Sequence, residues 1–93
     1  MTVHQLKSWP EFFGPLLDGS KNFELRKNDR DYRVGDHLLL QEYEPRDQRF
    51  TGRELAKRVT YVLTGAGIGS ILPLKGLSIG YAILGLSDVE KRP

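Results

Sequence analysis

Residues 19–29 read GSKNFELRKND, a segment that joins the end of a helix, a strand and a turn. Gly19 supplies the left-handed backbone conformation that commonly ends a helix. Apolar and charged side chains then alternate along residues 22–27, which is typical of a strand with Phe23 and Leu25 on one face. The turn-favouring residues that follow indicate the end of this strand. The stretch therefore predicts a helix that leads directly into a short strand.

The residues before this stretch have the features of a helix start. Ser8 is expected to cap the helix while Glu11, three residues later, reaches back to the N–H group of the cap. Pro10 then occupies the first turn, where no backbone donor is needed. The apolar residues recur at helical spacing, which favours a buried helix face over a platform for stacking bases. These residues are Trp9, Phe12, Phe13, Leu16 and Leu17.

Short strands are also expected in four other parts of the chain. They are residues 3–7, 37–43, 58–63 and 81–86. In the third of these segments, alternation places Val59, Tyr61 and Leu63 on one face. Five or six short strands with one N-terminal helix predict an α+β, mostly β fold that is built as a small closed sheet.

Length and composition limit the class of protein. The 93 residues suffice for a single domain, which we expect to span residues 1–93 with a frayed tail at residues 88–93. Cysteine is absent, which excludes a disulfide scaffold, a thiol nucleophile and a thiolate metal site. The first residues lack the apolar core of a signal peptide, and no apolar run has membrane-spanning length. These features favour a cytoplasmic protein with no membrane partner.

Charges are unevenly distributed along the chain. The net charge is only +2, which by itself does not indicate a nucleic-acid partner. Residues 21–58 carry ten basic and eight acidic side chains, whereas residues 59–86 carry a single charge, that of Lys75. The basic run at residues 46–58 is interleaved with acidic residues. It therefore fits either salt-sensitive phosphate contacts or an ordinary solvated hairpin.

Two other features lack the spacing of a known site. The Gly-rich loop at residues 65–69 follows a strand, but it matches neither a dinucleotide-binding motif nor a P-loop. We interpret it as a turn-forming loop. His4 and His37 are isolated and show no metal-binding spacing. We therefore expect no metal and no other cofactor.

The densest polar cluster lies on the strand expected at residues 22–27. Glu24 and Arg26 are two residues apart and share a face, and Lys21 sits where the chain enters the strand. The planar fork of an arginine and the compact charge of a lysine both suit phosphates, and the fork also suits base edges. The alternative is a solvated strand face with a local ion pair, which is worth at most about 1 kcal/mol.

These motifs resemble those of the DUF3850 family, which comprises small bacterial and phage proteins of the ASCH group in the PUA-like superfamily. The resemblance covers about residues 4–86 and rests on GxKxxExR at 19–26, KNDR at 27–30, VGD at 34–36 and TGR at 51–53. It implies a PUA-like pseudo-barrel of five or six strands with a helix after the first strand. It also implies a cleft beside the barrel that binds RNA or a modified nucleoside.

The resemblance assigns particular residues to this cleft. Lys21, Glu24 and Arg26 match positions that line the cleft in the family. The other residues expected to bind RNA or a nucleoside are Lys7, Lys27, Asn28, Arg30 and Arg53. The sequence sets no oligomeric state.

An enzymatic activity is the alternative that the resemblance implies. Some ASCH relatives are amidohydrolases that act on N4-acetylcytidine with a lysine, a threonine three residues later and a distant glutamate. Lys21 matches the lysine, but Glu24 replaces the threonine, and residues 59–86 contain no acidic residue. Glu42, on another strand, is the nearest substitute for the glutamate. If the protein is an enzyme, Lys21 and Glu24 are its expected catalytic residues, and an amidohydrolase is favoured over a ribonuclease.

Overall fold

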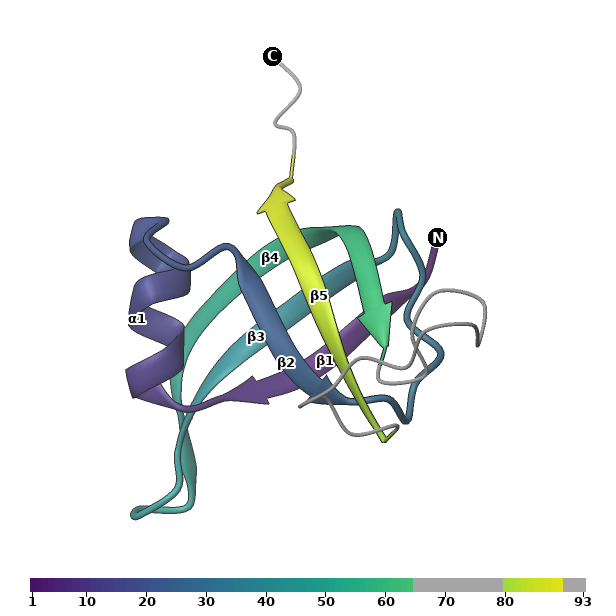
Figure 1. Cartoon of the computed structure of the whole chain (residues 1–93). Coiled ribbons are helices and arrows are strands. Elements are labelled where there is room, and N and C mark those ends of the chain that lie inside the picture. Colours follow the sequence, from purple (N-terminus) through teal and green to yellow (C-terminus); the bar gives the residue numbers. More distant parts are fainter. Residues whose placement is uncertain (65–79, 90–93) are drawn as a thin grey trace.

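The computed structural model describes residues 1–64 and 80–89, which form one sheet and one helix (Figure 1). The elements are β1 (Val3–Ser8), α1 (Pro10–Asp18), β2 (Phe23–Lys27), β3 (His37–Glu44), β4 (Arg49–Thr64) and β5 (Tyr81–Asp88). The strand order is β1-β3-β4-β5-β2, in which β1 and β3 are parallel and every other neighbouring pair is antiparallel. The expected α+β, mostly β fold with an N-terminal helix is therefore confirmed.

The sheet curls into a half-barrel, so that its two edge strands, β1 and β2, face each other across a gap (Figure 1). We call this gap the seam. Arg26 on β2 donates a hydrogen bond from Nη2 to the backbone oxygen of Lys7 on β1, over 2.8 Å. A side chain thus bridges the seam. The core fills the inside of the curl. Its buried apolar residues are Leu6, Phe13, Leu16, Tyr32, Leu38, Leu40, Val59, Ala82, Leu84 and Leu86.

Ser8 does not cap the helix, contrary to the sequence-based prediction. Trp9 is the N-cap residue and makes no side-chain cap hydrogen bond. The first turn is closed by the backbone N–H groups of Phe12 and Phe13, which donate to the Trp9 carbonyl oxygen at 2.9 and 2.8 Å. Ser8 is instead the last residue of β1, where it pairs with Glu42 on β3. Because this pairing extends to Ser8, its side chain points into the half-barrel and is not free to cap α1.

Only one narrow stripe of α1 is buried. Phe13 and Leu16 are fully enclosed, whereas Trp9, Phe12 and Leu17 are 47–49% exposed. The interpretation of Trp9 and Phe12 as core residues is therefore wrong. A helix of nine residues contacts the curled sheet along a single ridge, which leaves its flanks uncovered. The two aromatic side chains at the helix start are consequently accessible to a ligand.

The faces of β2 are reversed relative to an ordinary amphipathic strand. Its side chains alternate as predicted, but Phe23 and Leu25 lie on the outer face and are 47% and 54% exposed. Glu24 lies on the inner face and is 3% exposed, so the interpretation of this face as solvated is wrong. A buried carboxylate is tolerated at this position because two cations pair with it.

A bulge in β4 overturns the prediction that Val59, Tyr61 and Leu63 lie on one face of the strand. The pairing register with β5 shifts between Val59 and Tyr61, so the extra residue Thr60 reverses the alternation. Val59 is fully buried while Tyr61 is 54% exposed, and the two side chains do not share a face. Gly85 lies opposite this bulge. A Cβ added to Gly85 would lie 3.1 Å from Thr60 Oγ1 and 3.2 Å from Tyr61 Cβ.

We expect Gly85→Ala to lower the free energy of unfolding by about 1–2 kcal/mol, because the added methyl group overpacks the bulge. Urea unfolding followed by circular dichroism measures the change. Gly14→Ala is the matched control, since a Cβ at Gly14 meets nothing within 4 Å and alanine favours the helix. Equal stability changes for the two substitutions would contradict this prediction.

Some predictions concern residues at the limits of the described chain. The Gly-rich loop at residues 65–69 and residues 90–93 of the expected tail lie outside the described residues. Asp88, the first residue of that expected tail, belongs to β5 and pairs with Lys57 at 2.5 Å, so the prediction is wrong at this position. No helix among the described residues is long and apolar enough to cross a membrane.

Candidate functional site

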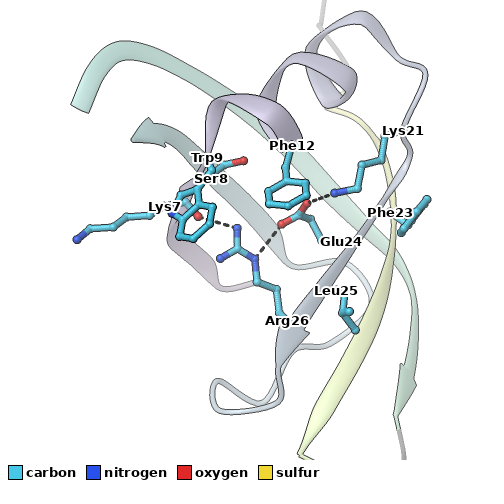
Figure 2. Close-up of a pocket in the computed structure, with 9 residues that line it drawn as sticks. All are labelled: Lys7, Ser8, Trp9, Phe12, Lys21, Phe23, Glu24, Leu25 and Arg26. Atoms are coloured by element: carbon cyan, nitrogen blue, oxygen red, sulfur yellow. Dashed lines mark hydrogen bonds and ion pairs between the residues drawn. The ribbon is translucent and has the colours of Figure 1, made fainter. Parts of the chain in front are cut away.

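A pocket of about 670 Å³ opens at the seam, between β1, the start of α1 and β2 (Figure 2). Three aromatic side chains line it, those of Trp9, Phe12 and Phe23. The charged residues of its centre are Lys21, Glu24 and Arg26. The structure therefore brings together the three residues that the sequence placed in one cluster and sets them against exposed aromatic rings.

Glu24 forms the buried centre of this pocket. Its Oε1 accepts a hydrogen bond from Lys21 Nζ and its Oε2 accepts one from Arg26 Nε, both at 2.8 Å. The Glu24 side chain is 4% exposed, against 20% for Lys21 and 23% for Arg26. Both carboxylate oxygens are engaged, so the negative charge is compensated within the protein. The three residues, which we call the Lys21–Glu24–Arg26 group, together carry one net positive charge.

Aromatic rings surround the lysine of this group. Lys21 Nζ lies 5.1 Å from the ring centroid of Phe12 and 5.4 Å from that of Phe23. At these distances an ammonium group is attracted to the face of a ring. The rings of Trp9 and Phe12 are inclined by only 26°, with 6.4 Å between their centroids. The pocket thus combines flat apolar walls with a fixed charge.

Arg53 does not line the pocket and belongs to a second ion pair, in which its own side chain is 55% exposed and that of Glu42 is buried. It donates from Nε to Glu42 Oε1 at 2.9 Å and from Nη2 to Glu42 Oε2 at 2.8 Å. Thr51 Oγ1 also donates to Glu42 Oε1, at 2.6 Å. The hydrogen bonds from Arg53, and then that from Thr51, hold the pKa of Glu42 below its ordinary value of 4.5, although burial acts in the opposite direction. Arg53 therefore pairs with Glu42 outside the pocket.

We expect Glu42→Gln to destabilise the protein at pH 7 by about 1–3 kcal/mol, because it removes the anion that pairs with Arg53. The folded-state pKa of Glu42 is lowered, so its contribution to stability is present above its ordinary pKa of 4.5 and is lost as the pH falls through the folded value. Urea unfolding of both proteins as a function of pH measures the difference in their stability. This difference should shrink as the pH falls below 4.5 and through the folded-state pKa of Glu42. A difference in stability that is constant with pH would contradict this assignment.

The remaining predicted residues lie at the rim of the pocket or outside it. Lys7 contributes its backbone oxygen to Arg26, while its ammonium group lies 4.3 Å from the ring centroid of Tyr43. In Figure 2 the Lys7 side chain points away from the Glu24 carboxylate. Three other predicted residues are exposed and do not line the pocket. They are Lys27, Asn28 and Arg30.

Sequence patterns did not identify the uncharged residues of the pocket. These are Ser8, Trp9, Phe12, Phe23 and Leu25. Ser8 is 2% exposed, and its hydroxyl has no hydrogen-bond partner among residues 1–64 and 80–89. Because Ser8 was expected to cap the helix, the sequence did not indicate that it lines the pocket. The one available signal was the aromatic content of residues 9–12 close to the charged cluster in the chain.

His4 connects the start of β1 to the turn before β3. His4 Nε2 lies 2.9 Å from Asp36 Oδ2, and the Asp36 carboxylate also accepts hydrogen bonds from the backbone N–H groups of Thr2 and Arg33. Burial raises the pKa of Asp36, but these hydrogen bonds outweigh it and leave the pKa below its ordinary value. The His4 ring packs against Tyr32, with 4.8 Å between centroids. Within the described residues, no three potential metal ligands come together.

The fold and the pocket together define a class: a small half-barrel protein with a charged, aromatic pocket at the seam between its edge strands. The chain belongs to the DUF3850 family, described as a domain of unknown function, which matches residues 3–86. A relative from Escherichia phage P2, described as an uncharacterized 12.9 kDa protein in GpA 3'region, is 37% identical over 83 residues. The matched part covers 77% of this chain and 74% of the relative. The DUF3850 resemblance is thus confirmed, whereas the wider ASCH and PUA-like assignment stays a prediction.

Proposed function

We propose that this protein binds RNA or a modified nucleoside by taking one nucleobase into the pocket at the seam. The observation that carries the proposal is the Lys21–Glu24–Arg26 group set against exposed aromatic rings. Sequence-specific proteins recognise single-stranded RNA chiefly by stacking bases on aromatic side chains and by hydrogen bonds to the base edges. This pocket offers both kinds of group within about 670 Å³, a volume that suits one small molecule.

The charges of the pocket also fit a nucleotide. Lys21 uses one of its three donors on Glu24, and Arg26 uses two of its five on Glu24 and the Lys7 carbonyl. The remaining donors are suited to a phosphate or to a carbonyl oxygen of a base. Glu24 positions both cations without neutralising the group as a whole. The pocket therefore favours a polar or anionic ligand that has a flat ring.

Lys21→Ala and Arg26→Ala are each expected to weaken binding by about 1–3 kcal/mol, because each removes a direct contact. Isothermal titration calorimetry measures the affinity for RNA oligomers at low and moderate salt and for free cytidine derivatives. Lys27→Ala is the matched control, since Lys27 also lies on β2 but is exposed and outside the pocket. If none of these ligands binds at either salt concentration, the proposal is wrong.

A hydrolase that uses the same pocket is the second candidate. The observation that favours it is the 2.8 Å contact between Lys21 and Glu24 in a pocket that also contains the Ser8 hydroxyl. In this reaction, water adds to the acyl carbon of an N4-acylcytidine and the C–N bond breaks, which yields cytidine and a carboxylic acid. Glu24 would accept a proton from the water. An absorbance assay with N4-acetylcytidine distinguishes the candidates: turnover that Lys21→Ala and Glu24→Ala both remove favours the hydrolase, and binding without turnover favours recognition alone.

A further inference from the structure

The seam exposes backbone groups of β2 that belong to no strand pairing. β2 lies at the edge of the sheet, and its one neighbour in the strand order is β5. Leu86 N donates to the Asn22 carbonyl oxygen, and Asn28 N donates to that of Gly80, both at 2.8 Å. In an antiparallel ladder, hydrogen-bonded residue pairs alternate with non-hydrogen-bonded pairs. These two bonds therefore fix which residues of β2 point toward β5.

The register from Asn22 to Asn28 makes Glu24 and Arg26 the hydrogen-bonded residues of β2. Phe23 and Leu25 alternate with them, so their backbone N–H and C=O groups point away from β5 and toward the seam. Within residues 1–64 and 80–89, no hydrogen bond occupies these groups. Both residues line the pocket. The free backbone edge of β2 is therefore part of the pocket wall.

β1 faces the same gap with its own edge. His37 N donates to the Thr2 carbonyl oxygen, so the even-numbered residues of β1 join the ladder with β3 and Lys7 does not. The Lys7 carbonyl instead accepts the hydrogen bond from the Arg26 guanidinium. The planar guanidinium of Arg26 thus already donates one hydrogen bond to a strand edge in this seam.

We propose that the β2 edge at Phe23 and Leu25 reads the hydrogen-bonding edge of the base in the pocket, an inference that rests on the proposed function. One residue of an extended edge presents an N–H donor beside a C=O acceptor. Each of the four RNA bases carries an acceptor beside a donor on the edge used in base pairing, so each can form two hydrogen bonds with the backbone of such a residue. The aromatic side chains fix the plane of the base, and the backbone edge of β2 recognises the hydrogen-bonding atoms of the base.

A peptide strand is the other kind of molecule that pairs with a free strand edge, and it gains affinity from a row of backbone hydrogen bonds. The seam favours a base, because Arg26 crosses it to Lys7 and leaves two edge residues, Phe23 and Leu25, in the pocket. The exposed aromatic rings and the net positive charge of the Lys21–Glu24–Arg26 group also match a nucleotide.

Two-dimensional NMR of the ¹⁵N-labelled full chain tests this inference. The four ribonucleosides and N4-acetylcytidine are added in turn, and quenching of Trp9 fluorescence reports whether each one binds. For a nucleoside that binds, the amide signals of Phe23 and Leu25 are expected to shift most and to exchange with deuterium about tenfold more slowly. The amide signals of Glu24 and Arg26, which lie in the ladder, should change less.

A variant tests the same inference independently. Leu25→Pro removes the edge N–H group but no bond of the β2–β5 ladder, and edge strands tolerate proline. It is expected to weaken binding about tenfold relative to Leu25→Ala, which keeps the N–H group. If Leu25→Pro does not fold, the NMR of the unaltered chain decides the question.

The outcomes separate this inference from the proposed function. Quenching of Trp9 without changes at the Phe23 and Leu25 amides overturns the inference and leaves the proposed function standing. If no nucleoside and no RNA oligomer binds, both are overturned. If an extended peptide shifts these two amide signals while no nucleoside does, the edge of β2 binds a peptide and the inference is also overturned.

Discussion

Replacement of Glu24 by alanine is expected to abolish nucleoside binding and to lower the free energy of unfolding by about 2–4 kcal/mol. The substitution leaves Lys21 and Arg26 largely buried, with side chains 20% and 23% exposed and no anion between them. Repulsion between the two cations and their uncompensated desolvation both oppose folding. Their partial exposure keeps the cost below that of a fully buried pair.

Urea unfolding measures the stability of the Glu24→Ala protein, and calorimetry measures its affinity for a nucleoside. Glu11→Ala is the control, because Glu11 is an exposed acidic residue of α1 outside the pocket. Glu24→Gln keeps the shape of the side chain and removes its charge, so intermediate effects are expected. If Glu24→Ala is as stable as Glu11→Ala and binds as tightly, the ion pairs of Glu24 do not organise the pocket.

Removal of two of the three aromatic side chains that line the pocket, in the double variant Trp9→Ala/Phe12→Ala, is expected to weaken nucleoside binding by about 2–6 kcal/mol, or about 1–3 kcal/mol for each stacking ring. Both rings are about half exposed, so the loss of stability should be small compared with the loss of binding. Leu17→Ala is the matched control. Leu17 lies on the same helix and is equally exposed, but it does not line the pocket.

Calorimetry is the suitable measurement for this double variant, because the substitution removes the single tryptophan of the chain. Urea unfolding of the same protein shows whether the fold is retained. An affinity equal to that of Leu17→Ala in a folded protein would mean that no base stacks on these rings.

The general fold could be predicted because its signals are local. Gly19 adopts a φ of 86° and ends α1, as its lack of a side chain predicts. Errors arose where strand pairing overrides a local preference. Ser8 is a good helix cap by residue type, but its pairing with Glu42 keeps it in β1. The bulge between Val59 and Tyr61 depends on the fit between β4 and β5 and has no signal within β4 itself.

The charged half of the candidate site could be predicted, but the aromatic half could not. Spacing places Glu24 and Arg26 on one face of a strand with Lys21 at its entry, and the family resemblance assigns all three to a cleft. Alternation defines two faces but does not say which one is buried, since that depends on how the sheet curls. In the same way, Trp9 and Phe12 keep helical spacing whether they are covered or exposed. The position of α1 against the sheet decides this, and it leaves both exposed.

Trp9 provides a direct test of nucleobase binding, because it is the single tryptophan of the chain and lines the pocket. Its fluorescence is followed during titration with the four ribonucleosides, N4-acetylcytidine and short RNA oligomers, with Glu24→Ala and Lys27→Ala studied in parallel. We predict saturable quenching by at least one of these ligands in the unaltered protein and in Lys27→Ala, and none in Glu24→Ala. Fluorescence that no ligand changes, or quenching that persists in Glu24→Ala, would contradict binding of a base at the Lys21–Glu24–Arg26 group.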